Sequence, residues 1–459
     1  MSAFLHDDFL LSTETGRLLY HDVAAGLPIV DLHNHLPPGD IAGNRRFETL
    51  TDLWLDDDHY KWRAMRQAGV EERLVTGDAD PWERFAAWAE ALPSLIRNPL
   101  YVWSHLELRR VFGIDAPLGP STARDIWEEV NRRLPELPAR ALLERFDVTA
   151  VATTDDPADD LDTHRLHRET GAGPTMIPTF RPDAAHVLLG DPEAWNAWAA
   201  RLSGPVEDLE SLLAALTRAY ERFAAAGGRA SDHGLASLPA SERDPARADA
   251  AVRRVKSGEA ADRPGRDAVL LEVVALAARL AADSQGVLQL HLGPRRNLSS
   301  RVRPDSGADA VGDRRQGPGL VRFLSSLERD GCLPRTVLYN ANPADDTLFA
   351  TVAGAFSRPG VAPLVQWGPP WWFNDHEDGM RRQLDVLSRT GRLAGFTGMV
   401  TDSRSLLSMT RHELFRRILC DTIGGDADRG LIPPDLELLG SIVRGICVDN
   451  ATRWFGLWA

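Results

Sequence analysis

Short apolar runs that end in polar residues recur along the chain and alternate with segments whose apolar residues follow a helical period. The clearest helical segments are residues 267–281 and 379–390. The apolar runs lie at residues 28–36, 148–156, 175–183, 228–235, 287–294, 335–342, 363–368 and 396–404. Strands that alternate with helices indicate βαβ units and a parallel sheet. The pattern therefore predicts an α/β fold, a distorted (β/α)8 TIM barrel, whose active site lies at the carboxyl ends of its strands.

Two segments are longer than a barrel requires. Residues 37–147, between the first two predicted strands, resemble several helices rich in Trp and Arg. We expect them to form a helical insert or subdomain that contributes to the substrate site. Residues 236–267, rich in Ala, Arg, Asp and Glu, predict a second, solvated helical excursion. The barrel itself is then assigned to residues 1–36 and 148–459.

The composition of the chain restricts its possible binding partners and its cellular compartment. The 459 residues carry 66 Asp and Glu against 52 Lys and Arg, a net charge of −14. Binding to nucleic acid or to an anionic membrane needs clustered positive charge, so neither partner is expected. No apolar run is long enough for a transmembrane helix, and the first residues do not resemble a signal peptide. An odd number of cysteines, three, argues against a disulfide framework. We expect a cytoplasmic protein.

The first predicted strand ends in Asp31-Leu-His33-Asn-His35. Alternate side chains of a strand share a face, so His33 and His35 point the same way and suit one shared metal ion. A pair of buried, hydrogen-bonded histidines is the alternative. The chain has only two lysines, Lys61 and Lys256, and both lie outside the predicted strands. A carboxylated lysine bridging two ions is therefore disfavoured, and either a single divalent metal or no essential metal is expected.

The eighth predicted strand ends in Asp402-Ser-Arg404. Closure of a barrel places strand eight beside strand one, so Asp402 is expected to reach a metal held by His33 and His35. Arg404 lies two residues further on and points into the same pocket. The alternative is a helix-capping aspartate followed by an exposed arginine.

Three further polar residues end predicted strands. His291, after the fifth, is interpreted as a metal ligand, an acid or base, a substrate contact or a structural histidine. Asp232 ends the weak fourth strand and adds a carboxylate. Arg181 ends the third, and its guanidinium suits a substrate carboxylate, although a surface ion pair is the competing interpretation.

Aromatic residues complete the candidate set. His59-Tyr60 lies in the predicted insert, where a tyrosine at the barrel mouth is suited to exchange a proton with a sugar hydroxyl. Its alternative is an aromatic face of an amphipathic helix. Trp371 begins an aromatic cluster after the seventh predicted strand and suits either a sugar pocket or packing against the insert.

Seven segments resemble the uronate isomerase (glucuronate isomerase) family, an outlying branch of the amidohydrolase superfamily, and they occur in the family's order. They are DLHNHL, DDDHYKWRAMR, IPTFRPD, SDHGL, LQLHLGPRRN, WWFNDHEDGM and TDSRSLLSMTRHELFRRILCDTIG. Together they cover nearly the whole chain, and the last is the most specific.

The resemblance implies interconversion of D-glucuronate with D-fructuronate, and of D-galacturonate with D-tagaturonate, in hexuronate breakdown. It implies a divalent metal, usually zinc, held by His33, His35 and Asp402. The positions of Tyr60, Arg181, His291 and Arg404 are implied to line the substrate site, with those of His59 and Asp232 nearby. A homo-oligomer is also expected.

The chemistry of an aldose–ketose isomerase suits these residues. A carboxylate such as Asp402 can move one proton between C2 and C1 through a cis-enediolate, if other groups stabilise the developing oxyanion. The metal, Arg404 and Tyr60 are assigned to the C1 and C2 oxygens. Either Arg181 or Arg404 would hold the C6 carboxylate, and His291 or Asp232 would assist opening of the sugar ring.

The second hypothesis is a hydrolase or deaminase with one metal, acting on an acidic substrate. The two histidines, His291 and Asp402 would then hold and activate a water molecule. The arginines and Tyr60 favour a polyhydroxy acid over an apolar amide. A sugar-acid-binding barrel without turnover is a third, weaker hypothesis.

Overall fold

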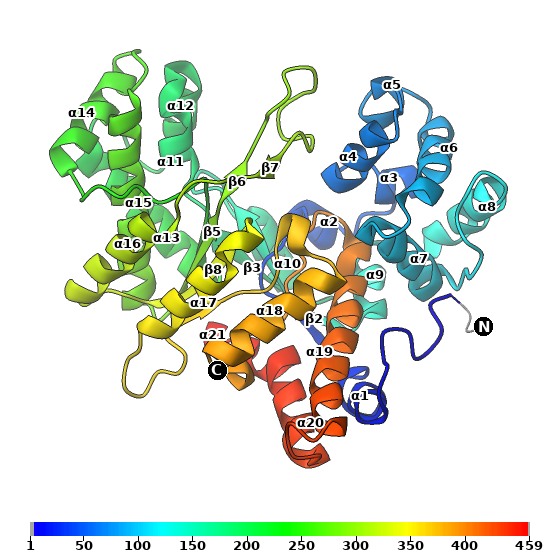
Figure 1. Ribbon diagram of the computed structural model, residues 1–459. Helices are drawn as coiled ribbons and strands as arrows, with labels where there is room; N and C mark the ends of the chain where they lie inside the picture. The colour runs from blue at the N-terminus through cyan, green and yellow to red at the C-terminus, as the bar shows by residue number, and fades with distance from the viewer. Residues whose placement is uncertain (1–3, 458–459) are drawn as a thin grey trace.

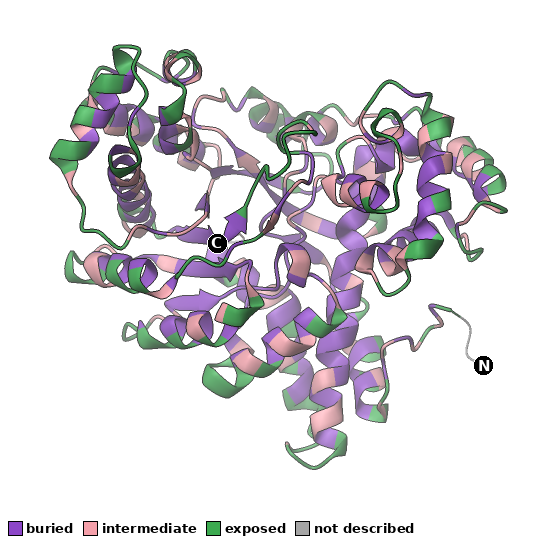
Figure 2. Ribbon diagram, turned by 45° about the horizontal axis from the view of Figure 1, so that its top comes forward, coloured by how far each residue is buried: buried purple, intermediate pink, exposed green. Residues whose placement is uncertain are grey.

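The computed structural model describes residues 4–457, in which seven parallel strands form one curved sheet (Figure 1). The strands are β1 (Ile29–Asp31), β2 (Val148–Asp155), β3 (Thr175–Phe180), β4 (Ala230–Leu235), β5 (Val287–Leu292), β8 (Arg335–Asn340) and β9 (Val365–Trp367). Each pairs with the next in that order, so the predicted barrel class is confirmed. The strands are buried on both faces, as a parallel sheet covered by helices requires (Figure 2).

The eighth predicted strand, residues 396–404, is the exception, because it forms no strand. Positive φ angles at Gly398 (76°) and Asp402 (46°) interrupt its extended backbone. The segment still closes the barrel onto the end of β1. The Asp402 N–H donates to the His33 carbonyl at 3.0 Å, and the His35 N–H donates to the Ser403 carbonyl at 2.9 Å. The backbone thus brings the ends of the first and eighth segments together, as closure predicts.

The chain between β1 and β2 is helical. Its helices are α2 (Pro38–Ala42), α3 (Leu50–Trp54), α4 (His59–Gln67), α5 (Glu72–Val75), α6 (Pro81–Ala91), α7 (Pro99–Phe112), α8 (Ala123–Arg133) and α9 (Ala139–Arg145). Most of them gather on one side of the barrel, blue to cyan in Figure 1. Asp58 caps α4 by accepting from the N–H groups of Tyr60 and Lys61, which fixes where His59 and Tyr60 leave the helix.

The remaining helices cover the sheet or pack on its ends. They are α1 (Glu14–Leu18), α10 (Asp162–Thr170), α11 (Ala184–Val187), α12 (Pro192–Ala199), α13 (Leu209–Ala225), α14 (Pro245–Lys256), α15 (Arg263–Asp283), α16 (Gly317–Arg329), α17 (Asp346–Ala355), α18 (Glu377–Thr390), α19 (Thr410–Asp428), α20 (Leu436–Arg444) and α21 (Asn450–Phe455). Across residues 4–457, no helix combines the length and the apolar character needed to traverse a bilayer.

A long excursion, the β6–β7 arm (residues 293–316), joins β5 to α16. Its antiparallel pair, β6 (Pro294–Arg295) and β7 (Ala310–Val311), rises from the barrel mouth in Figure 1. The arm contacts α4, since Arg63 donates to the carbonyls of Gly307 and Asp309 and Arg66 donates to that of Ser306. Gly307 has φ 90°, and a Cβ there would lie 2.5 Å from the His59 carbonyl oxygen. Only glycine allows this approach.

Candidate active site

A cavity of about 200 Å³ opens at the carboxyl ends of the strands. Eight sequence-predicted residues line it: His33, His35, His59, Arg181, His291, Trp371, Asp402 and Arg404. Trp372 and three residues of the β6–β7 arm, Arg296, Asp305 and Asp309, complete the wall. Two further predicted site residues adjoin this lining: Tyr60 stacks on His59, and Asp232 contacts His291. Segments from the whole length of the chain therefore meet at one site.

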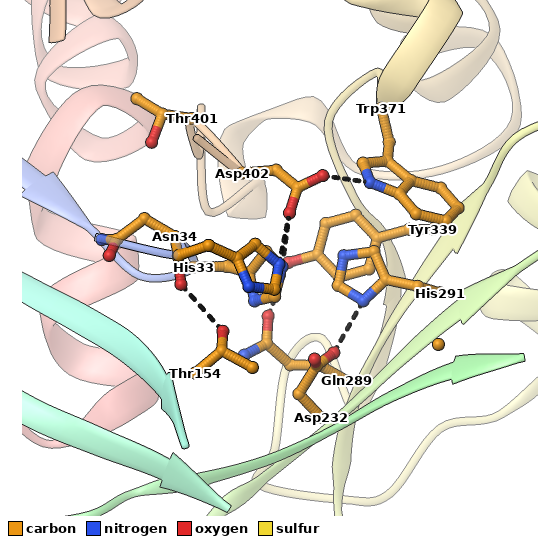
Figure 3. A network of polar contacts seen from close by, with 12 residues as sticks. His33, Asn34, Thr154, Asp232, Gln289, His291, Tyr339, Trp371, Thr401 and Asp402 are labelled. Carbon is orange, nitrogen blue, oxygen red and sulfur yellow. Dashed lines mark hydrogen bonds and ion pairs between the residues drawn. The ribbon is translucent and has the colours of Figure 1, made fainter. Parts of the chain in front are cut away.

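His33, His35 and Asp402 form the centre of the cavity. The Asp402 Oδ1 atom lies 3.0 Å from His33 Nε2 (Figure 3). It also lies 3.0 Å from His35 Nε2. Burial alone would raise the pKa of Asp402, but the two imidazoles outweigh it and hold that pKa well below its usual range. Two imidazole nitrogens and a carboxylate oxygen that converge in this way fit a divalent metal ion.

Asp402 is also held by its backbone and by a tryptophan. Its φ of 46° is uncommon for a residue with a side chain, and such residues cluster at functional sites. The indole N–H of Trp371 donates to Asp402 Oδ2. With Oδ1 facing the histidines and Oδ2 facing Trp371, the carboxylate has a fixed orientation at the cavity wall.

His291 stands on β5 between Asp232 and the aromatic ring of Tyr339. Its Nδ1 lies 2.7 Å from Asp232 Oδ1, and its ring stacks on Tyr339 at 4.0 Å (Figure 3). Burial lowers the pKa of His291 to about 4. The neutral ring therefore donates from Nδ1 to Asp232, which leaves Nε2 as an acceptor. That buried Nε2 has no hydrogen-bond partner among the described residues, so it is open to a ligand.

Arg181 is ion-paired on two sides. Its Nε lies 3.2 Å from Asp183 Oδ2, and its Nη1 lies 3.2 Å from Asp232 Oδ2. Burial alone would raise the pKa of Asp232, but Arg181 and His291 keep it well below its usual range. A Cβ at residue 234 would lie 2.1 Å from the Arg181 Nη2 atom, so the guanidinium can occupy this position because residue 234 is glycine. The structure thus balances the charge of Arg181 with two carboxylates.

Arg404 and His59 border the same cavity. Between residues 4 and 457, no side chain or backbone group forms an ion pair or hydrogen bond with the Arg404 guanidinium. Burial and then Arg404 lower the pKa of His59 to about 4, so this imidazole is neutral near pH 7. Tyr60 stacks on His59 at 4.4 Å, and burial raises the pKa of its phenol well above the usual value. The phenol of Tyr60 is therefore protonated at neutral pH and can donate a hydrogen bond.

The three residues of the β6–β7 arm that line the cavity were not predicted from the sequence. Arg296 follows directly after the fifth strand and its Pro294-Arg295 extension, a position typical of barrel site residues. Its place next to a predicted strand end was the available signal. Asp305 and Asp309 lie deep in an irregular segment whose path no periodicity predicts.

The fold and the site together define a class: a parallel α/β barrel that carries, at the carboxyl ends of its strands, a cluster of His and Asp residues suited to one divalent metal. The model of the family described as "Glucuronate isomerase" matches residues 1–455. The chain belongs to the glucuronate isomerase family and is an isomerase.

Individual relatives support the same family assignment. A uronate isomerase of Solibacter usitatus is 44% identical over 470 residues, which cover 99% of each chain. The crystal structure of a uronate isomerase from Thermotoga maritima has a TM-score of 0.92 at 34% identity, covering 99% of this chain and 100% of that one. A glucuronate isomerase structure from Caulobacter crescentus has a TM-score of 0.90 at 26% identity, covering 99% and 98%.

Proposed function

We propose that the protein interconverts D-glucuronate with D-fructuronate, and D-galacturonate with D-tagaturonate, by moving a proton between C2 and C1. The observation that carries this proposal is a fixed carboxylate, Asp402, in one cavity with His33, His35, His291 and Arg404. A small polyhydroxy acid matches the size and polarity of that cavity. Membership of an isomerase family supports the reaction class.

Asp402 is the proposed base. It removes the proton from C2 of the open-chain aldose, and the C–H electron pair forms the C1–C2 double bond of a cis-enediolate. The same carboxylate returns the proton to C1, while the C2 hydroxyl proton moves to the C1 oxygen. A single carboxylate can serve both carbons because they are adjacent. Asp402 is ionised at neutral pH, as a base must be, because two imidazoles hold its pKa well below the usual range.

Arg404 and Tyr60 are the proposed partners of the C1 and C2 oxygens. Arg404 lacks a counter-ion among the residues described, which suits it to an oxygen that becomes negative. Tyr60 stays protonated and donates. A divalent metal held by His33, His35 and Asp402 would polarise the substrate oxygens, and the imidazole ligands favour zinc.

His291 is proposed to assist opening of the pyranose ring. Its acceptor Nε2 is suited to take the proton of the anomeric hydroxyl as C1=O forms and the C1–O5 bond breaks, and the protonated imidazole then gives that proton to O5. Asp232 holds the ring through Nδ1. Arg181 is already paired with two carboxylates, which supports a role in fixing Asp232 and the pocket wall. His59 and Trp371 are proposed to contact the sugar.

We infer a helical insert over residues 37–147 that contributes to the substrate site, packed on a barrel formed by 1–36 and 148–459. A homo-oligomer in the cytoplasm, without nucleic-acid or membrane partners, is proposed as well. Free cysteines and a net charge of −14 support the compartment and the lack of anionic partners.

The alternative, a metal-dependent hydrolase or deaminase, is not favoured. The glucuronate isomerase family model matches residues 1–455. A relative named uronate isomerase is 44% identical over 99% of this chain.

The proposed reaction is tested by NMR on purified protein with D-glucuronate and D-galacturonate in separate samples, with and without a chelator. We expect D-fructuronate and D-tagaturonate to accumulate to equilibrium, and the two rates to give the preferred substrate. If metal-replete protein forms no ketose from either sugar, the proposed function is wrong.

Metal content gives a second test. We expect about one divalent ion per chain by mass spectrometry, because three ligands converge at one point. The double variant His33→Ala, His35→Ala should lose most of it. His21→Ala is the matched control, since His21 contacts Asp8 at the surface with 43% of its side chain exposed. Unchanged metal content in the double variant would remove these ligands from the proposal.

A further inference from the structure

One buried cation, Arg411 on α19, lies behind the cavity and has no part in the proposed reaction. Its side chain is 2% exposed, and it does not line the cavity. Its Nη1 donates to Asp375 Oδ2 at 3.1 Å and to the Thr401 carbonyl at 3.0 Å. Its guanidinium also lies 3.8 Å from the ring centre of Trp103 and 5.7 Å from that of Tyr60. Burying an ion pair costs free energy that apolar packing does not, so this pair points to a role besides stability.

Arg411 holds the peptide group that precedes Asp402. The Thr401 carbonyl accepts from Arg411, and the Thr401 N–H and hydroxyl both donate to the buried Asp31. The φ angle of Asp402, 46°, is the rotation that directly follows this peptide group. A left-handed backbone at a residue with a side chain persists only where its surroundings hold it. The hydrogen bond from Arg411 is therefore one of the contacts that direct the Asp402 carboxylate.

The ion pair with Asp375 reaches Asp402 by a second route. Asp375 ends the turn that begins at Trp371, and its N–H donates to the Trp372 carbonyl at 3.1 Å. The indole N–H of Trp371 donates to Asp402 Oδ2. Arg411 thus anchors both the peptide group before the carboxylate and the turn that carries its indole partner.

The aromatic contacts connect the same cation to the helices between β1 and β2. Tyr60 belongs to α4 and Trp103 to α7, and their rings meet edge to face with centres 6.5 Å apart. A guanidinium over an aromatic ring is attracted by the negative face of the ring. Arg411 therefore joins the segment that carries Asp402 to the helix that carries Tyr60.

We infer that Arg411 is a positioning residue for the isomerisation: it sets the position of Asp402, the proposed base, relative to Tyr60, the proposed donor. It acts through these two residues, because it lies outside the cavity lining. Both groups must meet the same pair of substrate carbons, and small displacements of reacting groups slow a reaction by large factors. The inference rests on the proposed function.

The test is steady-state kinetics of Arg411→Lys with D-glucuronate in metal-replete buffer, with kcat corrected for the folded fraction from near-ultraviolet circular dichroism. Lysine keeps the charge but loses the planar guanidinium that packs on two rings while it donates to Asp375 and Thr401. The value of kcat should fall about 10- to 100-fold while KM stays within about threefold, because the side chains that line the cavity are unchanged.

Arg417→Lys is the matched control on the same helix. The Arg417 side chain is 3% exposed, pairs with Glu413 at 2.9 Å and lies 4.1 Å from the ring centres of both Phe9 and Tyr20. These partners do not line the cavity. Both lysine variants should lower the temperature of thermal unfolding by comparable amounts, since each weakens a buried ion pair with aromatic contacts. Only Arg411→Lys should lose kcat.

A corrected kcat of Arg411→Lys within about threefold of the wild type, whatever its KM, overturns the inference. An equal fall of kcat in Arg417→Lys also overturns it, since the loss would then follow stability. If Arg411→Lys does not fold, Asp375→Asn decides: loss of the ion pair should lower kcat about 3- to 10-fold at constant KM, and an unchanged kcat overturns the inference. Inactive wild-type protein would instead contradict the proposed function.

Discussion

Replacing Asp402 with Asn should reduce kcat for uronate isomerisation by about 10³-fold or more while the protein remains folded. The amide keeps the size of the side chain and its contact with Trp371 but cannot accept the C2 proton. The measurement is the initial rate of ketose formation by NMR in deuterated water, with exchange at C2 of the recovered aldose followed in the same spectra. Both ketose formation and C2 exchange should be lost.

Asp402 is also a proposed metal ligand, so the variant needs a comparison that separates the two roles. Metal-stripped wild-type protein provides it, because that sample lacks the ion and keeps the carboxylate. Asp402→Asn should be slower than metal-stripped protein if the carboxylate is the base. Turnover within about tenfold of the metal-replete wild type would show that the base lies elsewhere.

Replacing Arg404 with Met should lower kcat by about 10²- to 10³-fold, the usual cost of removing one group that stabilises a developing oxyanion. The effect should fall on kcat more than on KM, because the charge on the C1 and C2 oxygens is greatest in the transition state. Steady-state kinetics with D-glucuronate measures both values.

Arg404→Lys keeps the charge and should recover part of kcat. A large rise in KM for Arg404→Met at unchanged kcat would assign Arg404 to ground-state binding of the acid group. That result would contradict its proposed role at the reacting carbons.

Much of the barrel could be predicted because buried parallel strands are nearly continuous apolar runs. The predicted ranges 148–156 and 287–294 begin at the first residues of β2 and β5. The prediction of an eighth strand was wrong because the positive φ of Asp402, a residue with a side chain, depends on tertiary contacts that the sequence pattern does not contain. Its position beside β1 was nevertheless correct, because barrel closure fixes it.

The same distinction applies to the site. The prediction that His33 and His35 face one way rested on strand alternation, but β1 ends at Asp31 and both histidines lie beyond it. They still meet at Asp402, because backbone hydrogen bonds hold residues 33 and 35 against residues 402 and 403. The pairing of Arg181 with Asp232 is not local. It depends on two neighbouring strands and on the missing side chain of Gly234, which only the assembled sheet brings together. For this reason the sequence alone does not decide which arginine binds the substrate carboxylate.

The contact between Gly307 and the His59 carbonyl has a consequence for recombination among relatives. The β6–β7 arm and helix α4 lie far apart in the sequence, yet they fit at a distance that admits no side chain at residue 307. A chimera that exchanges the arm alone would pack the arm of one protein against helix α4 of another, although the two segments fit closely only within one protein. The two segments should therefore be transplanted as a pair, and homologous enzymes should tolerate a swap of both better than a swap of either.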